Sequence, residues 1–279
     1  MGTDRRSIAT GTPLLLAEVE EGVGTVTINR PDRRNAMNLE MVRALEVVLA
    51  EFETAPEVRC LVLQGAGGAF CAGGDLKEIR PGASLAGAEH LSLDQWLRVG
   101  QLTQRNTLGR IYQMAKPVVA SVAGAAAGSG MAFALACDLR IAAEDAFFTT
   151  AFASVGLCGD SGGSFFLTQI VGAAKARELY YLPERIDATT AERMGIVHRV
   201  VAPTDLASET VALARRLASG PTVAYGYMKE NIRRAASGAD FYECLDVELT
   251  HHTRTGLTQD FEEATSAFLA KRTPVFNGR

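Results

Sequence analysis

The segment CGDSGGS, residues 158–164, contains residue types that suit two different chemistries. Ser161, within Gly-Asp-Ser-Gly-Gly, has the local sequence of the nucleophile of chymotrypsin-like proteases, and Gly159-x-Ser161-x-Gly163 also fits the nucleophile elbow of α/β-hydrolases. Its neighbour Asp160 offers a carboxylate that can take up and return a proton. Which of these two residues reacts depends on what the rest of the chain can place beside them.

The histidines, one of which a serine nucleophile would need as its base, give Ser161 little support. None of the four lies in the Ala-Ala-His-Cys context of chymotrypsin-like proteases: they are His90, His198, His251 and His252. Residues 154–158 are short and interrupted by glycine, whereas a nucleophile elbow follows directly on a strand. A partner at His251 or His252 stays open. We favour Ser161 as a small polar residue in a turn before a helix.

Two loops rich in glycine and alanine offer a further kind of chemistry. Residues 72–75 and 128–130 each lie between an expected strand and an expected helix. A helix N-terminus has free main-chain N–H groups and favours negative charge, and small side chains let a ligand atom approach. Two such N–H groups that converge on one oxygen form an oxyanion hole. Taken singly, each loop is better explained as a tight turn that allows close helix packing, and neither has the pattern of a nucleotide-binding loop.

The elements that must position these loops alternate between strand and helix in the first two thirds of the chain. Hydrophobic periodicity predicts a hairpin over 14–29, a helix capped by Asn38, a helix over about 93–114, and strands at 59–63, 118–122, 139–144, 146–150 and 197–201. From residue 205 to 269 the periodicity is helical. We therefore predict an α/β fold with a flexible tail over 1–11, a core over 12–204 and a helical segment over 205–279.

Composition and charge exclude several classes of function. The 28 basic and 32 acidic residues give a net charge of −4 without a long basic run, which argues against a nucleic-acid binder. No stretch is long and apolar enough to span a membrane, and the N-terminus has no secretory signal pattern. The five cysteines are scattered and lack metal-binding spacing. We expect reduced thiols in a cytoplasmic protein with neither nucleic-acid nor membrane partners.

Five segments occur in the order and spacing of the enoyl-CoA hydratase/isomerase (crotonase) family. They are NRPDRRNAMN, GAFCAGGDLKEI, KPVVASVAGAAAGSGMAFALACDLRIAAEDAFF, VGLCGDSGG and FLAKRTPVFNG. The chain resembles this family over about residues 12–276. The resemblance implies a crotonase-like spiral of ββα units, followed by a helical C-terminal segment that builds trimers, often paired into hexamers. A homotrimer or a dimer of trimers is therefore the expected assembly.

The resemblance also implies an acyl-CoA site. The two oxyanion donors correspond to the N–H groups of Gly74 and Ser129, which would hold the thioester oxygen as it becomes an enolate. CoA is part of the substrate, and neither a separate cofactor nor a metal is expected. The further residues that the family pattern assigns to CoA binding are Arg33, Ala72, Asp75, Leu76, Lys77, Phe268 and Lys271.

These CoA-binding residues have different expected contacts. Residues 72–77 would line the adenine and pantetheine path, partly through the main chain. Arg33 and Lys77 would meet the CoA phosphates, and Phe268 and Lys271 match a C-terminal helix that reaches the CoA of a neighbouring subunit. For Arg33, Lys77 and Lys271, a solvated surface charge stays an alternative.

The two glutamates that hydratases of this family use are missing. Counting from the loop motifs, their positions hold Ala132 and Phe152, and neither side chain can transfer a proton. The segment VGLCGDSGG resembles the dienoyl-CoA and ring-epoxide phenylacetyl-CoA isomerases of the family, which have an acid/base aspartate where Asp160 stands. From the residues alone, Asp160 is equally well explained as the N-cap of the following helix. Together with the two oxyanion loops, we predict Asp160 as the acid/base and Ser161 as a bystander.

The surroundings of Asp160 are expected to be apolar. Phe152, Leu157, Phe165 and Phe166 lie close in sequence and would form the walls. The segment 82–95, with Glu89, His90 and Asp94, is expected to act as a lid and is a possible source of a second acid/base.

The leading hypothesis is an acyl-CoA isomerase that shifts a double bond with Asp160 as its single acid/base. Three alternatives stay open: an enoyl-CoA hydratase that uses Asp160 and an ordered water, an enzyme in which Asp160 is a nucleophile for hydrolysis or dehalogenation, and a non-catalytic acyl-CoA binder.

Overall fold

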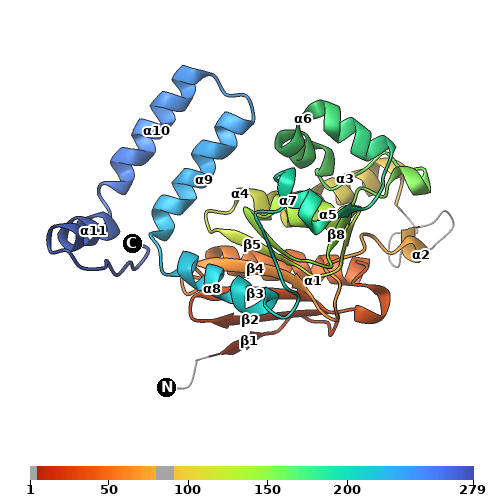
Figure 1. Cartoon of the computed structure of the whole chain (residues 1–279), viewed down its shortest axis with the longest axis horizontal. Helices are drawn as coiled ribbons and strands as arrows, with labels where there is room; N and C mark the ends of the chain where they lie inside the picture. The colour runs from red at the N-terminus through yellow and green to blue at the C-terminus, as the bar shows by residue number, and fades with distance from the viewer. Residues whose placement is uncertain (1–4, 80–90) are drawn as a thin grey trace.

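A mixed seven-stranded sheet forms the base of the protein (Figure 1). The computed structural model describes residues 5–79 and 91–279, and the predicted lid over 82–95 therefore lies largely outside the described residues. The strand order is β1-β2-β3-β4-β5-β7-β10, antiparallel from β1 to β3 and parallel from β3 to β10. Its strands are β1 Arg6–Ile8, β2 Leu15–Glu20, β3 Val23–Ile28, β4 Cys60–Gly65, β5 Val118–Val122, β7 Leu139–Ala143 and β10 Arg199–Val201.

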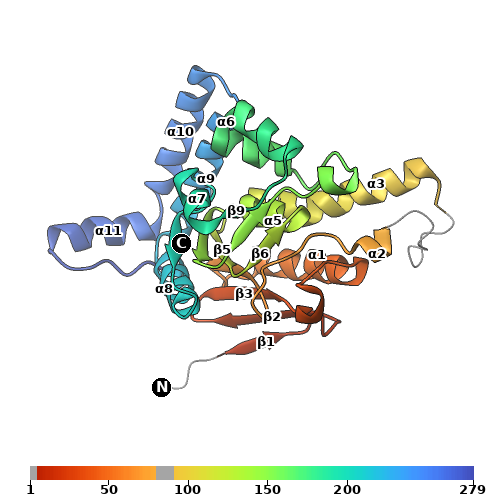
Figure 2. The same cartoon turned by 45° about the vertical axis from the view of Figure 1, so that its right-hand side comes forward.

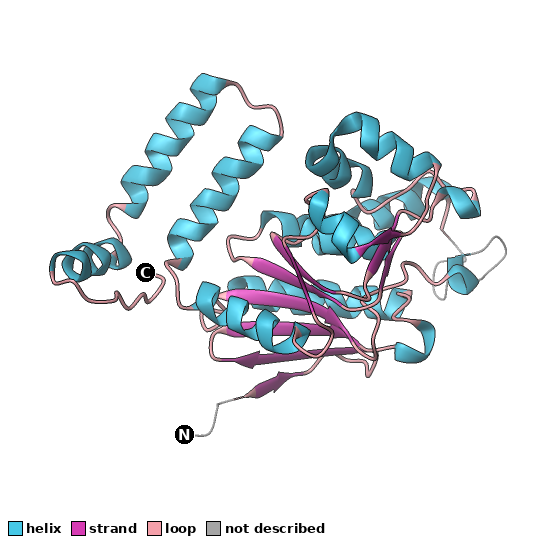
Figure 3. Cartoon of the chain, in the orientation of Figure 1, coloured by secondary structure: helices cyan, strands magenta, loops and turns pink. Residues whose placement is uncertain are grey.

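A second, three-stranded sheet stands above the first and carries one of the two glycine loops. Its strands are β6 Ala125–Ala127, β8 Phe147–Thr149 and β9 Ile186–Asp187, in the order β6-β8-β9. In the described part of the chain, the strands end at Val201 and the remaining elements are helices (Figure 3). This change matches the boundary that the sequence predicts near residue 204.

The helices cover both faces of the large sheet and extend beyond it. They are α1 Leu39–Thr54, α2 Leu76–Ile79, α3 Leu93–Gln104, α4 Arg110–Gln113, α5 Ser129–Ala136, α6 Gly163–Tyr181, α7 Ala188–Arg193, α8 Leu206–Ala218, α9 Thr222–Ala236, α10 Phe241–Thr255 and α11 Gln259–Leu269. Short 3-10 turns lie at Pro31–Arg33 and Ala153–Val155, and a π-helical turn at Arg105–Gly109 joins α3 to α4. The predicted helix over 93–114 is thus confirmed, with this turn inside it.

Helix α1 shows how closely the hydrophobic pattern specifies these elements. The Asn38 side chain accepts a hydrogen bond from the Met41 N–H and caps the helix, as predicted. The apolar positions are buried in the main core on one face of the sheet: Met41, Leu45, Val48, Leu49 and Phe52. Helix α8 covers the other face, where Ala214 and Ala218 pack with residues of β3, β4 and β5.

The predicted flexible tail over 1–11 differs from the structure at residues 6–8. These residues form strand β1, which pairs antiparallel with β2 and places Arg6 opposite Val19. A three-residue strand with one buried side chain leaves almost no periodic signal in the sequence, which explains the difference. Residues 1–4 lie outside the described residues. Within the residues that are described, no helix has both the length and the apolar character needed to cross a membrane.

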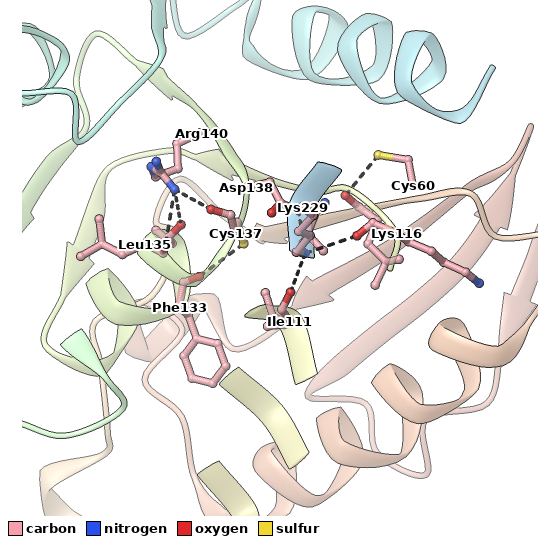
Figure 4. Close-up of polar contacts among 12 residues, drawn as sticks. Cys60, Ile111, Lys116, Phe133, Leu135, Cys137, Asp138, Arg140 and Lys229 are labelled. Carbon is pink, nitrogen blue, oxygen red and sulfur yellow. Dashed lines mark hydrogen bonds and ion pairs between the residues drawn. The ribbon is translucent and has the colours of Figure 1, made fainter. Parts of the chain in front are cut away.

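A partly buried ion pair is among the contacts that attach helix α9 to the core. The Lys229 ammonium lies 2.8 Å from the Asp138 carboxylate and donates to the carbonyl oxygens of Ile111 and Lys116 at 2.9 and 3.4 Å (Figure 4). Asp138 also accepts a hydrogen bond from the Val118 N–H, at the start of β5. This connection ties α9 to the ends of α4, β5 and α5.

Beyond this connection, the C-terminal helices extend away from the sheets. In both views α11 lies at one end of the molecule and α2 at the opposite end (Figures 1 and 2). Helix α9 has no buried residue, and α10 buries only His251. Unlike α8, helices α9 and α10 therefore contribute little to the core of their own chain.

Candidate active site

The two glycine loops are joined by main-chain hydrogen bonds. The Cys71 N–H donates to the Ala125 carbonyl at 2.9 Å, and the Ala127 N–H donates to the Cys71 carbonyl at 3.0 Å. A Cβ at Gly130 would lie 2.2 Å from the Cys71 carbonyl oxygen, so only glycine permits this contact. The loops that the sequence predicts separately therefore form one rigid unit.

Gly74 presents its N–H to the space between the loops. Its neighbours are paired with Met37: the Met37 N–H donates to the Gly73 carbonyl at 2.8 Å, and the Asp75 N–H donates to the Met37 carbonyl at 2.9 Å. Because successive N–H groups of an extended chain point to opposite sides, the Gly74 N–H faces away from Met37. It makes no hydrogen bond within the described residues.

Ser129 occupies the first position of α5, where main-chain N–H groups have no partner inside the helix. Gly128 precedes it with a φ of 54° and a ψ of −125°, a conformation that suits glycine. A Cβ at Gly73 would lie 3.5 Å from the Ser129 nitrogen, so the first loop lies close to this helix end. As at Gly74, no described residue accepts a hydrogen bond from the Ser129 N–H.

The opposite end of α5 is held by a buried cation. The Arg140 guanidinium donates to the carbonyl oxygens of Cys137 and Ile196, each at 2.6 Å, and more weakly to those of Ala134 and Leu135 (Figure 4). A positive charge at a helix C-terminus complements the helix dipole. Arg140 therefore fixes the helix whose N-terminus carries Ser129.

A cavity of about 300 Å³ opens between the loops, α1, α3 and the segment before α6. Gly74, Ser129 and Asp160 all line it, as do Ala72 and Leu76. Its walls are largely apolar, and the larger side chains among them are Met37, Leu39, Val42, Trp96, Leu108, Phe133, Phe152, Val155 and Leu157. A polar floor beneath apolar walls is typical of a small-molecule site.

The Asp160 side chain does not cap the following helix, which rules out that alternative. Gly162 is the N-cap of α6 and provides no side-chain cap, while the Ser129 hydroxyl donates to Asp160 Oδ1 at 3.0 Å. Within the described residues, Asp160 Oδ2 has no hydrogen-bond partner. The carboxylate therefore lies beside one of the two free N–H groups.

Tyr180 of α6 supports the loop that carries Asp160. A Cβ at Gly159 would lie 2.9 Å from the Tyr180 ring, and one at Gly163 would lie 2.8 Å from its hydroxyl. The ring also stacks on Phe152, with centroids 6.2 Å apart. Burial, together with the Asp160 charge, raises the pKa of Tyr180 to about 12, so its hydroxyl stays protonated at neutral pH. The sequence analysis did not single out this residue.

Ser161 lacks the surroundings of a nucleophile. It is buried, with a φ of 58°, and none of the histidines that the structure describes is hydrogen-bonded to it. His251 is bonded to Asn231 and stacks on Tyr227, both on α9. His198 accepts a hydrogen bond from the Arg140 N–H. His252 lies on the exposed surface of α10, and His90 is outside the described residues. The two histidines left open as partners of Ser161, His251 and His252, therefore lie on α10 and do not pair with it in this chain.

The other residues of the predicted CoA path have different surroundings. The Asp75 carboxylate forms an ion pair with Arg30 at 2.8 Å and accepts the Lys77 N–H, so its side chain is already engaged. These contacts lower the pKa of Asp75 despite the opposing effect of burial. Lys77 is exposed on α2, and Arg33 is half exposed beside Asp32. Neither of these two cations lines the cavity.

Phe268 and Lys271 lie far from the cavity of their own chain. Phe268 is 82% exposed near the end of α11, and Lys271 follows that helix. Because α11 and α2 lie at opposite ends of the molecule (Figure 2), these two residues cannot complete this site in a single chain. Their predicted contact requires a neighbouring subunit.

Two of the side chains predicted to form the cavity walls do not do so, and the sequence analysis missed one buried residue that stabilises a nearby loop. Phe165 and Phe166 do not line the cavity and instead pack edge-to-face against Tyr112. Asn35 is fully buried, and its amide donates to the carbonyls of Ala66 and Ala69 at 2.8 and 2.6 Å. A polar residue within the NRPDRRNAMN segment was the available signal for this contact.

Comparison with known proteins shows which family the chain resembles. Residues 18–279 match the family described as enoyl-CoA hydratase/isomerase. The chain is 38% identical to the 1,2-epoxyphenylacetyl-CoA isomerase of Escherichia coli, covering 95% of this chain and 98% of that protein. It is 37% identical to a probable enoyl-CoA hydratase of Rhodobacter capsulatus, covering 94% and 97%.

A solved structure gives the same result for the fold. The crystal structure of an enoyl-CoA hydratase from Polaromonas sp. JS666 superposes with a TM-score of 0.84 at 33% identity, covering 94% of this chain and 99% of that one. The chain therefore belongs to the enoyl-CoA hydratase/isomerase family.

Proposed function

We propose that this enzyme is an acyl-CoA isomerase that shifts a double bond, with Asp160 as its single acid/base. The observation that carries the proposal is the position of Asp160 in the cavity beside Ser129, together with Ala132 and Phe152 at the two positions expected for hydratase glutamates. Glu78 also borders the cavity, but it faces Arg30 and a neighbouring groove and so lies at the rim.

The proposed reaction balances with one proton carrier. The thioester oxygen accepts hydrogen bonds from the Gly74 and Ser129 N–H groups. Asp160 Oδ2 removes a proton from carbon, and the C–H electron pair moves through the acyl chain onto the thioester oxygen. The same carboxyl group then returns the proton to another carbon, and the charge leaves the oxygen. No water is added, so a second carboxylate is not required.

The relatives support this choice without deciding it, because one is named an isomerase and another a hydratase. The deciding assay compares a 3-enoyl-CoA with crotonyl-CoA. We expect conversion of the 3-enoyl thioester to its conjugated isomer, seen as a gain of enoyl-thioester absorbance. We also expect no comparable loss of that absorbance with crotonyl-CoA. Rapid hydration of crotonyl-CoA would replace the proposal with the hydratase alternative.

We also propose that the C-terminal segment, residues 205–279, assembles the chain into a homotrimer or a dimer of trimers. Large apolar side chains are exposed on α10, α11 and the turns beside them: Phe241, Tyr242, Leu249, Leu257, Phe261, Phe268 and Leu269. An exposed apolar surface of this extent is typical of an interface. In such an assembly Phe268 and Lys271 would reach the CoA of a neighbouring subunit. The five free thiols support a reducing compartment such as the cytoplasm.

Light scattering tests the assembly. We expect a mass of three or six copies of the 29.7 kDa chain, and smaller species for Leu249→Glu on α10. Val47→Glu is the matched control. Val47 is similarly exposed but lies on α1, outside the C-terminal segment. A wild-type protein that stays monomeric at micromolar concentration would contradict the proposed assembly.

A further inference from the structure

The Ser129 side chain has a hydrogen bond that neither the family pattern nor the oxyanion hypothesis uses. Its hydroxyl donates to Asp160 Oδ1 at 3.0 Å, across 31 residues of sequence. The hydroxyl has one proton to donate, and in this arrangement the carboxylate receives it. Ser129 also lines the cavity, and its main-chain N–H makes no hydrogen bond to any residue that the structure describes.

We propose that the Ser129 hydroxyl is a positioning residue for Asp160. It holds Oδ1 and thereby leaves Oδ2 free to exchange a proton with the substrate. The inference rests on the proposed isomerase function and deepens it: one residue would contact the thioester oxygen through its N–H and orient the base through its side chain.

The rigidity of α5 makes this hydrogen bond effective. Seven of the eight residues of α5 are buried, and Arg140 holds its C-terminal carbonyls. The loop 159–162 packs on Tyr180 through Gly159, but the Asp160 side chain itself is exposed, and its hydrogen bond within the described residues is the one to Ser129. The hydrogen bond therefore ties an exposed carboxylate to a buried, closely packed helix.

The consequence for the chemistry is geometric. A carboxylate on a short side chain can rotate about its Cβ–Cγ bond, and a proton carrier works only within about 3 Å of the carbon-bound proton. With Oδ1 held by Ser129, the position of Oδ2 is defined relative to the Ser129 N–H. The base and one oxyanion donor thus keep a constant separation during the shuttle.

Substitutions at Ser129 separate the hydroxyl from the N–H. Ser129→Ala and Ser129→Cys keep the main-chain donor but remove or weaken the side-chain donor, whereas Ser129→Thr keeps a hydroxyl. We expect kcat for the 3-enoyl-CoA isomerisation to fall about 10- to 100-fold in the Ala and Cys variants, with KM changed less than about threefold. Ser129→Thr should retain most of the wild-type kcat.

Ser121→Ala is the matched control. Ser121 is buried on β5, and its hydroxyl accepts a hydrogen bond from Thr210 at 2.9 Å, away from the cavity. This variant should lose thermal stability but keep the wild-type kcat. If Ser129→Ala does not fold, Ser129→Cys, which fills nearly the same volume, provides the test.

The outcomes distinguish the inference from the proposed function. An inactive wild-type enzyme on the 3-enoyl-CoA panel removes the function. An active wild type whose Ser129→Ala and Ser129→Cys variants keep the same kcat overturns only the positioning role. A rise in KM with kcat unchanged also overturns the positioning role, because the side chain then contributes to substrate binding. A selective loss of kcat that Ser129→Thr restores supports it.

Discussion

Helix α5 and helix α10 have opposite relations to the chain that contains them. Seven of the eight residues of α5 are buried, whereas only one of the fifteen residues of α10 is. The two glycine loops are connected by main-chain hydrogen bonds, while α10 contacts the core of its own chain little. The part of the site around Gly74, Ser129 and Asp160 therefore has a fixed geometry within one chain, whereas α10 and α11 expose large apolar side chains.

This difference suits the chemistry that we propose. Donors that stabilise developing charge must be preorganised, and close packing around α5 provides this. A helical segment that packs against a neighbouring copy instead gains its stability by association. Substitutions in the two regions should therefore fail in different ways, which the following variants test.

Gly130→Ala should produce the largest effect, because it breaks the contact between the two glycine loops. The added Cβ would lie 2.2 Å from the Cys71 carbonyl oxygen, and a main-chain atom cannot move away cheaply. We expect the free energy of unfolding to fall by about 3 kcal/mol and the isomerase activity by at least about 100-fold. Chemical denaturation and the 3-enoyl-CoA assay measure the two effects.

Gly100→Ala is the control for this variant. Gly100 lies in α3 with open space around it, so a methyl group there should be neutral or stabilise the protein by up to about 1 kcal/mol. A Gly130→Ala protein with wild-type stability and activity would show that the two loops are not rigidly joined.

Lys229→Met tests the connection between the two regions. The substitution removes the charge that pairs with Asp138, a carboxylate whose side chain is only 29% exposed. We expect the free energy of unfolding to fall by about 2 kcal/mol, because a partly buried carboxylate remains without its cation. Limited proteolysis should also cut the C-terminal segment faster than in the wild type.

Arg234→Met on the same helix is the comparison, since its ion pairs with Glu230 and Glu243 lie at the surface. Its effect on stability should be clearly smaller. Equal stability of Lys229→Met and the wild type would mean that α9 is held by other contacts.

The smallest effect is expected at His198, which should make the stability of the core depend on pH. Partial burial and the nearby Arg140 charge lower the pKa of His198 from 6.5 to about 4, and its Nδ1 accepts the Arg140 N–H. The unfolded chain then binds more protons between these pH values, so the free energy of unfolding falls as the pH drops from 6.5 towards 4.

The contribution should stay below about 1 kcal/mol, because the ring is partly open to solvent. We expect the free energy of unfolding, measured by denaturation between pH 7 and about 4.5, to change less with pH in His198→Gln than in the wild type. His252→Gln, on the exposed surface of α10, is the control. If the free energy of unfolding of His198→Gln depended on pH as strongly as that of the wild type, the pH dependence would not come from His198.

The sequence predicted the fold wherever the pattern was local. The α1 periodicity with its Asn38 cap and the buried strand β5 were predicted closely, because burial of one face imposes a regular spacing. Strand β1 was missed, since a strand of three residues has too little pattern to detect.

For the site, the sequence pointed to Gly74, Ser129 and Asp160, and the structure brings all three to one cavity. The engagement of Asp75 by Arg30 and the Ser129–Asp160 hydrogen bond were not predictable, because both join segments far apart in the chain. The wrong walls at Phe165 and Phe166 have a similar cause. The direction of a side chain on α6 depends on how the helix packs, not on sequence proximity to Asp160.

The most direct test of the central claim is the exchange of carbon-bound hydrogen in D2O, followed by NMR on a 3-enoyl-CoA or a saturated acyl-CoA. This measurement requires only the enolate and the base, whatever the natural acyl group is. The account predicts that the wild-type enzyme exchanges hydrogen at C2 or C4, and that Asp160→Asn slows this exchange about 10²- to 10⁴-fold while still binding the thioester. Exchange by Asp160→Asn at the wild-type rate would contradict the account.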